Sequence, residues 1–116
     1  YRLTKDNLGK EQMSKAYVIG LIKFTNKRDF IENFAFRIPK LIKEGGGRIL
    51  SRTPDSHFHE GREFDLHVVV EFDDFSKAKS TMASEEWETI TSHRTNNSDT
   101  EYGSFLLLEG GDKLAK

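Results

Sequence analysis

A chain of 116 residues suffices for one domain with a modest core, and its 35% hydrophobic content includes nine Phe that concentrate burial into large side chains. With 18 Lys and Arg against 19 Asp and Glu the formal net charge is −1, which offers nucleic acid no basic surface, and no apolar segment approaches the roughly 20 residues that span a membrane. The sequence has no Cys, which excludes disulfides and thiolate chemistry and is compatible with the cytoplasm, the expected location.

Residues 1–15 are polar and show no period, so we expect an N-terminal arm, with a short helical turn around Lys10 to Ser14. The segment from Ala16 to Phe24 is predicted to be the first strand. Side chains alternate between the two faces of a strand. Both faces of this strand are apolar and require burial: Val18 and Ile22 on one, and Tyr17, Ile19 and Leu21 on the other.

A helix is predicted next, capped by Asn26 and with Asp29 in its first turn, where negative charge suits the helix dipole. Pro39 lies inside the helical pattern and is expected to remove a backbone bond to Ala35 and to bend the last turns. Gly45 to Gly47 then end the helix and allow a reversal into a strand. Spacings of three and four place these apolar side chains on one helix face: Phe30, Ile31, Phe34, Ile38, Leu41 and Ile42.

The second strand is predicted at Arg48 to Arg52, followed by a turn or break at Pro54 to Ser56. His57 to Gly61 is expected to continue as an extended edge segment. Leu66 to Phe72 is predicted as the next strand because it carries three consecutive Val.

The second helix is predicted to begin at the cap Asp74 and to break in two at a second cap, Ser84, which acidic residues follow. The last strand is predicted at Gly103 to Glu109. The buried stripe of the second helix is predicted to consist of Phe75, Ala78, Met82, Trp87 and Ile90.

The order of these elements predicts an α+β, ferredoxin-like βαββαβ domain over residues 16–110, with a four-stranded antiparallel sheet and a tail at residues 111–116. Two helices can cover only one face of a sheet, yet its strands are apolar on both faces. We therefore expect the open faces of two copies to pack together, forming a homodimer with the architecture of a dimeric α+β barrel.

Short stretches along residues 16–110 carry a family resemblance. They are Ala16-Tyr17-Val18-Ile19, Pro39 with Gly46-Gly47-Arg48, Glu60-Gly61, Phe72 with Asp74, Ser84 with Trp87, Arg94, and Leu108-Glu109-Gly110. In order and spacing this set resembles the domain of unknown function 1330 family, whose members resemble dimeric α+β barrel proteins. The family has no established reaction, so the resemblance implies an architecture and a dimer. Trp87 replaces the family's usual Tyr, which puts any chemistry through that phenol in doubt.

The resemblance singles out Glu60 and Arg94 as candidate site residues. Arg94 would offer its planar fork to a substrate carboxylate, with Glu60 as a base or as the group that orients it. The alternative is structural: the two side chains form an ion pair, or each bonds a loop backbone.

His67 and Glu71 lie four residues apart on one predicted strand and point the same way, and Lys23 takes an equivalent face of the first strand. If that face lines a barrel interior, these groups are the natural polar anchors of a small-molecule pocket. If the strand ends emerge into solvent, the groups are simply hydrated. The predicted ligand-binding residues are Tyr17, Glu60, His67, Trp87 and Arg94, and the candidate catalytic residues are Glu60, His67, Glu71 and Arg94.

His57 and His59 alternate, so a strand would bring both imidazoles to one side beside Glu60, as zinc and iron sites require. A third histidine would have to be His67 or His93, which lie elsewhere in the sequence. We therefore expect a hydrated segment here, with no metal and no cofactor.

Two hypotheses for function remain open. In the first, the barrel cavity binds a small anionic or polar metabolite, with Arg94 holding the anionic group and with Glu60, His67 or Glu71 handling protons if a reaction occurs. In the second, the protein is a non-catalytic structural or interaction dimer without a dedicated active site. The sequence does not decide whether the protein is an enzyme.

Overall fold

The computed structural model describes residues 14–115, so the predicted arm and its helical turn lie almost wholly outside the described residues. The elements are β1 (Ala16–Ile22), α2 (Lys27–Phe30), a π-helical turn η1 (Ile31–Ala35), α3 (Ile38–Glu44), β2 (Gly47–Thr53), β3 (Leu66–Phe72), α4 (Phe75–Met82), α5 (Glu85–Thr95) and β4 (Ser104–Glu109). Within this range, no helix is long and apolar enough to cross a membrane.

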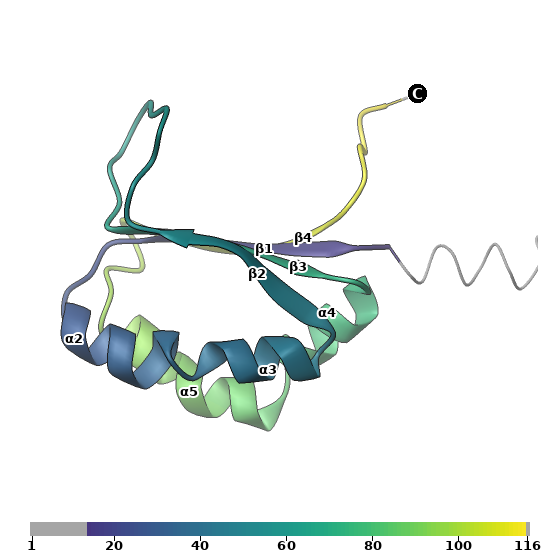
Figure 1. Cartoon of the computed structure of the whole chain (residues 1–116), viewed down its shortest axis with the longest axis horizontal. Coiled ribbons are helices and arrows are strands. Elements are labelled where there is room, and N and C mark those ends of the chain that lie inside the picture. The colour runs from purple at the N-terminus through teal and green to yellow at the C-terminus, as the bar shows by residue number, and fades with distance from the viewer. Residues whose placement is uncertain (1–13, 116) are drawn as a thin grey trace, which may run out of the picture.

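The four strands form one antiparallel sheet in the order β2-β3-β1-β4. The helices of residues 14–115 lie below the sheet in Figure 1, and none of these residues forms a layer over its upper face. This confirms the predicted α+β, ferredoxin-like fold.

The core lies between the sheet and the helices. Side chains alternate between the two faces of each strand, and the apolar ones on the lower face pack against the helices. Along β1, burial alternates residue by residue, with Val18 only 2% exposed. Phe72 on β3 and Phe30 on α2 are the largest fully buried side chains in residues 14–115. The helices contribute Phe34, Ala35, Ile38, Ile42, Ala78, Trp87 and Ile90 to this core.

The first helical region begins as the sequence predicts, since the Asn26 side chain accepts a hydrogen bond from the backbone N–H of Asp29 at 3.2 Å. The predicted effect of Pro39, a bend in the last turns of one continuous helix, is wrong. The π-helical turn and a break at Phe36 end the first segment, and Pro39 then occupies the first turn of α3. Proline is tolerated there because the first-turn N–H groups have no helical partner. The helical region is therefore interrupted before the proline, at Phe36 and Arg37.

The three glycines after α3 make the reversal into β2 possible. Gly46 has a φ of 82°, a conformation that side chains disfavour. A Cβ on Gly47 would approach Cδ2 of Phe72 to 2.9 Å, so only glycine lets β2 pass this ring without a shift.

The second helical region confirms both predicted caps. Asp74 accepts from the N–H of Ser76 at 2.8 Å and begins α4, and Ser84 accepts from the N–H of Trp87 at 3.2 Å and begins α5. The break at Ser84 lets both helices present an apolar side to the sheet, with Ala78 and Trp87 buried.

The predicted extended edge segment at His57 to Gly61 is wrong. Residues 54–65 form a loop that leaves the sheet on the side away from the helices (Figure 1). Gly61 has a φ of 91°, which interrupts an extended course, and the loop is braced by its own side chains: Ser56 Oγ lies 3.0 Å from His59 Nδ1.

Removing a cap tests this account of the helical layer. We expect Ser84→Ala to lower the free energy of unfolding by about 1 kcal/mol, because the N–H of Trp87 loses its acceptor. Ser80→Ala is the control, since the Ser80 hydroxyl donates to the Ser76 carbonyl within α4 and caps nothing. Urea denaturation of both variants measures the difference, and equal stabilities would contradict the capping role.

Candidate functional site

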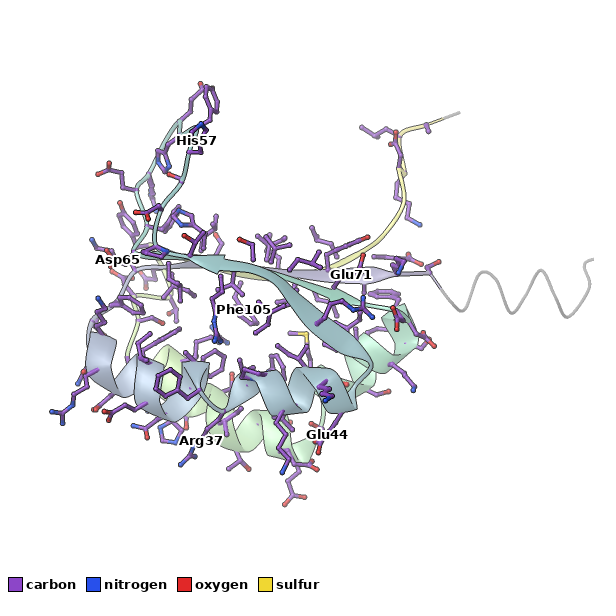
Figure 2. All side chains as sticks on the ribbon, in the orientation of Figure 1. Arg37, Glu44, His57, Asp65, Glu71 and Phe105 are labelled. Atoms are coloured by element: carbon purple, nitrogen blue, oxygen red, sulfur yellow. The ribbon has the colours of Figure 1, made fainter. Side chains whose placement is uncertain are left out.

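The sheet separates the candidate residues onto two faces. Tyr17, His67 and Glu71 lie on the open face, and Trp87 and Arg94 come from α5 on the helix side. Figure 2 shows Phe105 between the sheet and the helices and His57 on the projecting loop. Glu60 belongs to the same loop. Arg94 and the polar residues of the open face are therefore not brought together within one chain.

The strand register shows what the open face presents. Its middle row runs from Val69 on β3 through Ile19 on β1 to Leu106 on β4. Leu106 and Leu108 are each 47% exposed although they belong to a sheet. The face is therefore apolar along its centre across β3, β1 and β4, whereas Ser51 of β2, opposite Val69, is polar.

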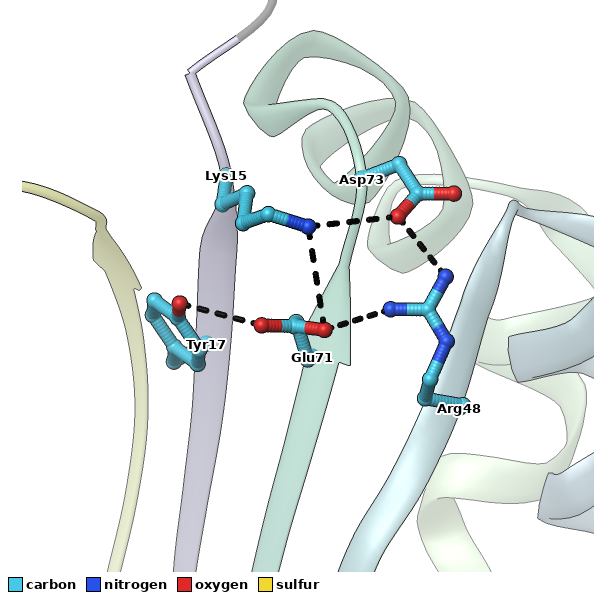
Figure 3. A network of polar contacts seen from close by, with 5 residues as sticks. All are labelled: Lys15, Tyr17, Arg48, Glu71 and Asp73. Carbon is cyan, nitrogen blue, oxygen red and sulfur yellow. Dashed lines mark hydrogen bonds and ion pairs between the residues drawn. The ribbon is translucent and has the colours of Figure 1, made fainter.

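At one end of this face, five side chains form a connected polar network (Figure 3): Lys15, Tyr17, Arg48, Glu71 and Asp73. Arg48 donates through Nη1 to Glu71 and through Nη2 to Asp73 at 2.7 Å, and the Tyr17 hydroxyl donates to Glu71 Oε2 at 3.1 Å. Lys15 Nζ lies 3.8 Å from Glu71 and 3.6 Å from Asp73. Two cations thus balance two carboxylates, and Glu71 is occupied by structural contacts.

These contacts shift the pKa values of groups in the network, among them Asp73 and Tyr17. The hydrogen bond from Arg48, with its charge, lowers the pKa of Asp73 below its usual value. The hydrogen bond to Glu71, with burial and the nearby negative charge, raises the pKa of Tyr17. Both shifts favour the protonation states in which the network is complete.

At the other end of the face, His67 and Glu60 line one hollow of about 450 Å³ between the loop and the sheet. His67 Nδ1 lies 3.1 Å from the Thr53 carbonyl, so we assign the proton to Nδ1. His67 Nε2 is buried without a hydrogen-bond partner. Glu60 forms no ion pair with any residue of the described range 14–115. The ion pair with Arg94 that the sequence offered as an alternative is therefore absent within these residues.

The histidines of the loop do not assemble as the metal interpretation requires. His59 uses both ring nitrogens inside the loop, Nδ1 toward Ser56 and Nε2 toward the Gly61 carbonyl at 3.1 Å. Among residues 14–115 no group of three or more His, Cys, Asp and Glu side chains is placed to hold a metal ion.

Arg94 occupies the last turn of α5 with few polar partners. Its guanidinium lies 4.0 Å from the ring centroid of Phe105, and Nη2 donates to the Thr91 hydroxyl at 3.2 Å. Its Nε is buried without an acceptor. Burial lowers the pKa of Arg94, because desolvation penalises the charged form.

Phe105 also lines an apolar cleft between the sheet and the helices, whose free volume is about 30 Å³. That is room for about one water molecule. Trp87 lines this cleft as well and is 5% exposed, so it acts here as a core residue. Arg52 reaches the same cleft and donates to the Ala35 carbonyl at 2.8 Å.

Sequence reasoning missed Lys15 and Arg48 as partners of Glu71, and Asp73 as the second carboxylate that these two cations contact. It also missed Phe105 as the partner of Arg94. The partners of Glu71 become visible only from the strand register, which places Arg48 opposite Glu71 and Tyr17 beside it. No local pattern marks Phe105, because its strand and α5 meet only in the folded chain.

Comparison with known proteins shows the family of this chain. The model of the domain of unknown function 1330 family matches residues 15–110, nearly all of the described chain. Among curated proteins, none matches the sequence.

Several solved structures share the fold. A protein of unknown function from Rhodopseudomonas palustris has a TM-score of 0.70 and 9% identity, with 96% of each chain covered. SnoaB, a cofactor-independent oxygenase from Streptomyces nogalater, has a TM-score of 0.58 and 12% identity, covering 89% of this chain and 99% of its own. An uncharacterised NIPSNAP-like domain protein from Burkholderia xenovorans has a TM-score of 0.53 and 10% identity, with 90% of each chain covered. At these identities the likeness shows the fold alone.

The polar network predicts a pH dependence of stability. Because the pKa of Asp73 is lowered in the folded protein, its contribution to stability is present above its unfolded pKa of about 3.9 and is lost as the pH falls through the folded value. We expect Arg48→Met to be less stable than the wild type at pH 7 and the difference to shrink toward pH ~3. Urea unfolding at several pH values measures this, and a constant difference would contradict the assignment.

Proposed function

Because the chain belongs to the domain of unknown function 1330 family, which sets its architecture without a reaction, we propose its function from the two faces of its sheet. The protein acts as a homodimer through the open face, and each subunit binds a small anionic molecule at Arg94 on the helix side. The observation that carries the binding proposal is the buried Nε of Arg94, which has no acceptor.

The composition of the open face supports the homodimer. An isologous interface must be complementary to itself, because the same patch meets its own copy. The apolar centre around Ile19, Val69 and Leu106 can pack on its twin and remove apolar surface from water. The charged residues at its end are already paired within one subunit, so a second copy is not repelled.

The state of Arg94 supports an anion site. Arg94 is half-buried, and its buried Nε–H has no acceptor. The described part of the chain supplies its guanidinium with one hydroxyl and one aromatic ring, and a desolvated donor without a partner costs free energy. A carboxylate or phosphate oxygen would provide the missing acceptor and the missing negative charge. The cleft that Phe105 lines holds only about 30 Å³, and Arg94 does not line it, so the ligand would bind outside this cleft.

A second candidate function keeps the homodimer and omits the ligand. It is favoured by the same small cleft and by the separation of Arg94 from Glu60 and His67, the groups expected to handle protons with it. In this reading Arg94 serves the packing of α5 on Phe105. The oxygenase activity of SnoaB belongs to that protein and rests on a shared fold alone here.

A charge in the open face tests the homodimer. We expect Ile19→Glu to raise the dimer dissociation constant more than about 100-fold, because two copies of the charge meet in a desolvated interface. Thr89→Glu adds the same charge at an exposed position of α5 and should leave the dimer intact. Sedimentation velocity measures both, with circular dichroism to confirm the fold. A wild-type protein that stays monomeric at micromolar concentration would sink the proposal.

Thermal unfolding with small anions tests the Arg94 site. An anion at 100 times its dissociation constant stabilises the fold by about 2.7 kcal/mol, so acetate, benzoate or phosphate should raise the wild-type Tm. Arg94→Met should abolish that rise while keeping or raising the Tm without anion, since a buried N–H without an acceptor has been removed.

Arg37→Met, at an exposed arginine, is the matched control and should retain the full response to the anion. A response that persists in Arg94→Met would contradict the site. If no anion shifts the wild-type Tm and Arg94→Met lowers stability, the structural reading of Arg94 is correct. Glu60→Gln should change neither quantity, because Glu60 lies on the projecting loop.

A further inference from the structure

Two segments leave the sheet on its open side, at opposite ends of the molecule. The loop of residues 54–65 rises at the left of Figure 1 and the tail of residues 110–115 rises at the right, while the helices lie below. The open face lies between these two projections, so a second copy seated on that face would stand between them.

Each projection exposes a large apolar side chain. Phe58 in the loop is 80% exposed and Leu114 in the tail is 93% exposed, the two highest values among the large apolar residues of the described chain. Exposed apolar side chains on a projecting element commonly mark a contact with a partner. Within the chain described, neither side chain has a surface to cover it.

The loop has a defined conformation, in which Phe58 lines the rim of the hollow that it shares with Leu21 and His67 and leaves most of its surface exposed. His59 braces it through Ser56 and the Gly61 carbonyl, with contacts of 3.0 and 3.1 Å. At its base Phe64 packs edge-on against Tyr102 with centroids 5.6 Å apart. Arg62 stacks over the same ring at 5.0 Å and donates to the Tyr102 carbonyl. These contacts fix the loop in the conformation that leaves Phe58 exposed.

The length of the loop decides which part of a partner it reaches. Twelve residues separate Thr53 from Leu66, so six residues out and six back span at most about 20 Å. Face-to-face sheets pack about 10 Å apart. The tip of the loop is therefore long enough to pass the partner's sheet at its edge.

We propose that the loop of residues 54–65 clasps the second copy of this chain, with Phe58 buried against the partner beyond the edge of its sheet. This rests on the homodimer proposed above. By twofold symmetry the contact occurs twice, once from each subunit. The loop thereby selects a copy of the same chain over other proteins that offer an apolar sheet face, since only a partner shaped to receive Phe58 completes the contact.

A matched pair of phenylalanines tests the clasp. Phe58→Ser should raise the dimer dissociation constant by at least about tenfold, because each of two symmetric contacts loses a buried aromatic ring. Phe36→Ser is the control: Phe36 is 69% exposed on the helical side and should leave the constant unchanged. Analytical ultracentrifugation over a dilution series measures both, and circular dichroism confirms that the exposed positions tolerate serine.

The absence of cysteine allows a second measurement. A fluorophore on Phe58→Cys should shift to a buried, apolar emission when the dimer forms, and one on Phe36→Cys should not. A dimer whose constant and emission are unchanged at position 58 overturns the clasp and leaves the sheet-face dimer standing. A wild-type monomer overturns both.

Discussion

Coverage of the sheet on one side alone is the constraint on which the rest of the structure depends. The helices bury the face that carries Val18, Val70 and Phe72, and the face that carries Ile19, Val69 and Leu106 has no covering layer within residues 14–115. Apolar burial is the main favourable term in folding and association, so the second face is the basis of the proposed homodimer. The projecting loop and the charge-balanced polar network both belong to that open side.

The sheet also divides the chemistry of the chain. Because side chains alternate strictly along a strand, His67 and Glu71 cannot share a face with the residues that pack on α5. Arg94 therefore contacts Phe105 and Thr91, while His67 lines a hollow together with residues of the loop. A reaction that used both sets would need a second subunit to bring them together.

Whether a candidate residue has hydrogen-bond partners for its polar atoms distinguishes a structural role from a functional one. Glu71 and His59 have their polar atoms engaged inside the chain, which accounts for them as structural residues. Arg94 Nε and His67 Nε2 are buried without a hydrogen-bond partner. An unsatisfied buried polar atom costs free energy. These two positions are where a ligand or a second subunit would contribute most.

The sequence by itself determined the features that depend on neighbouring residues. The strand Leu66–Phe72 and the caps Asn26, Asp74 and Ser84 follow from alternation and from hydrogen bonds that span two or three residues. Only the tertiary structure decided the interruption before Pro39, the projection of the loop and the pairing of Arg48 with Glu71 and Asp73. Those features depend on strand register and on which side of the sheet an element packs, and these are set by contacts between residues far apart in the chain.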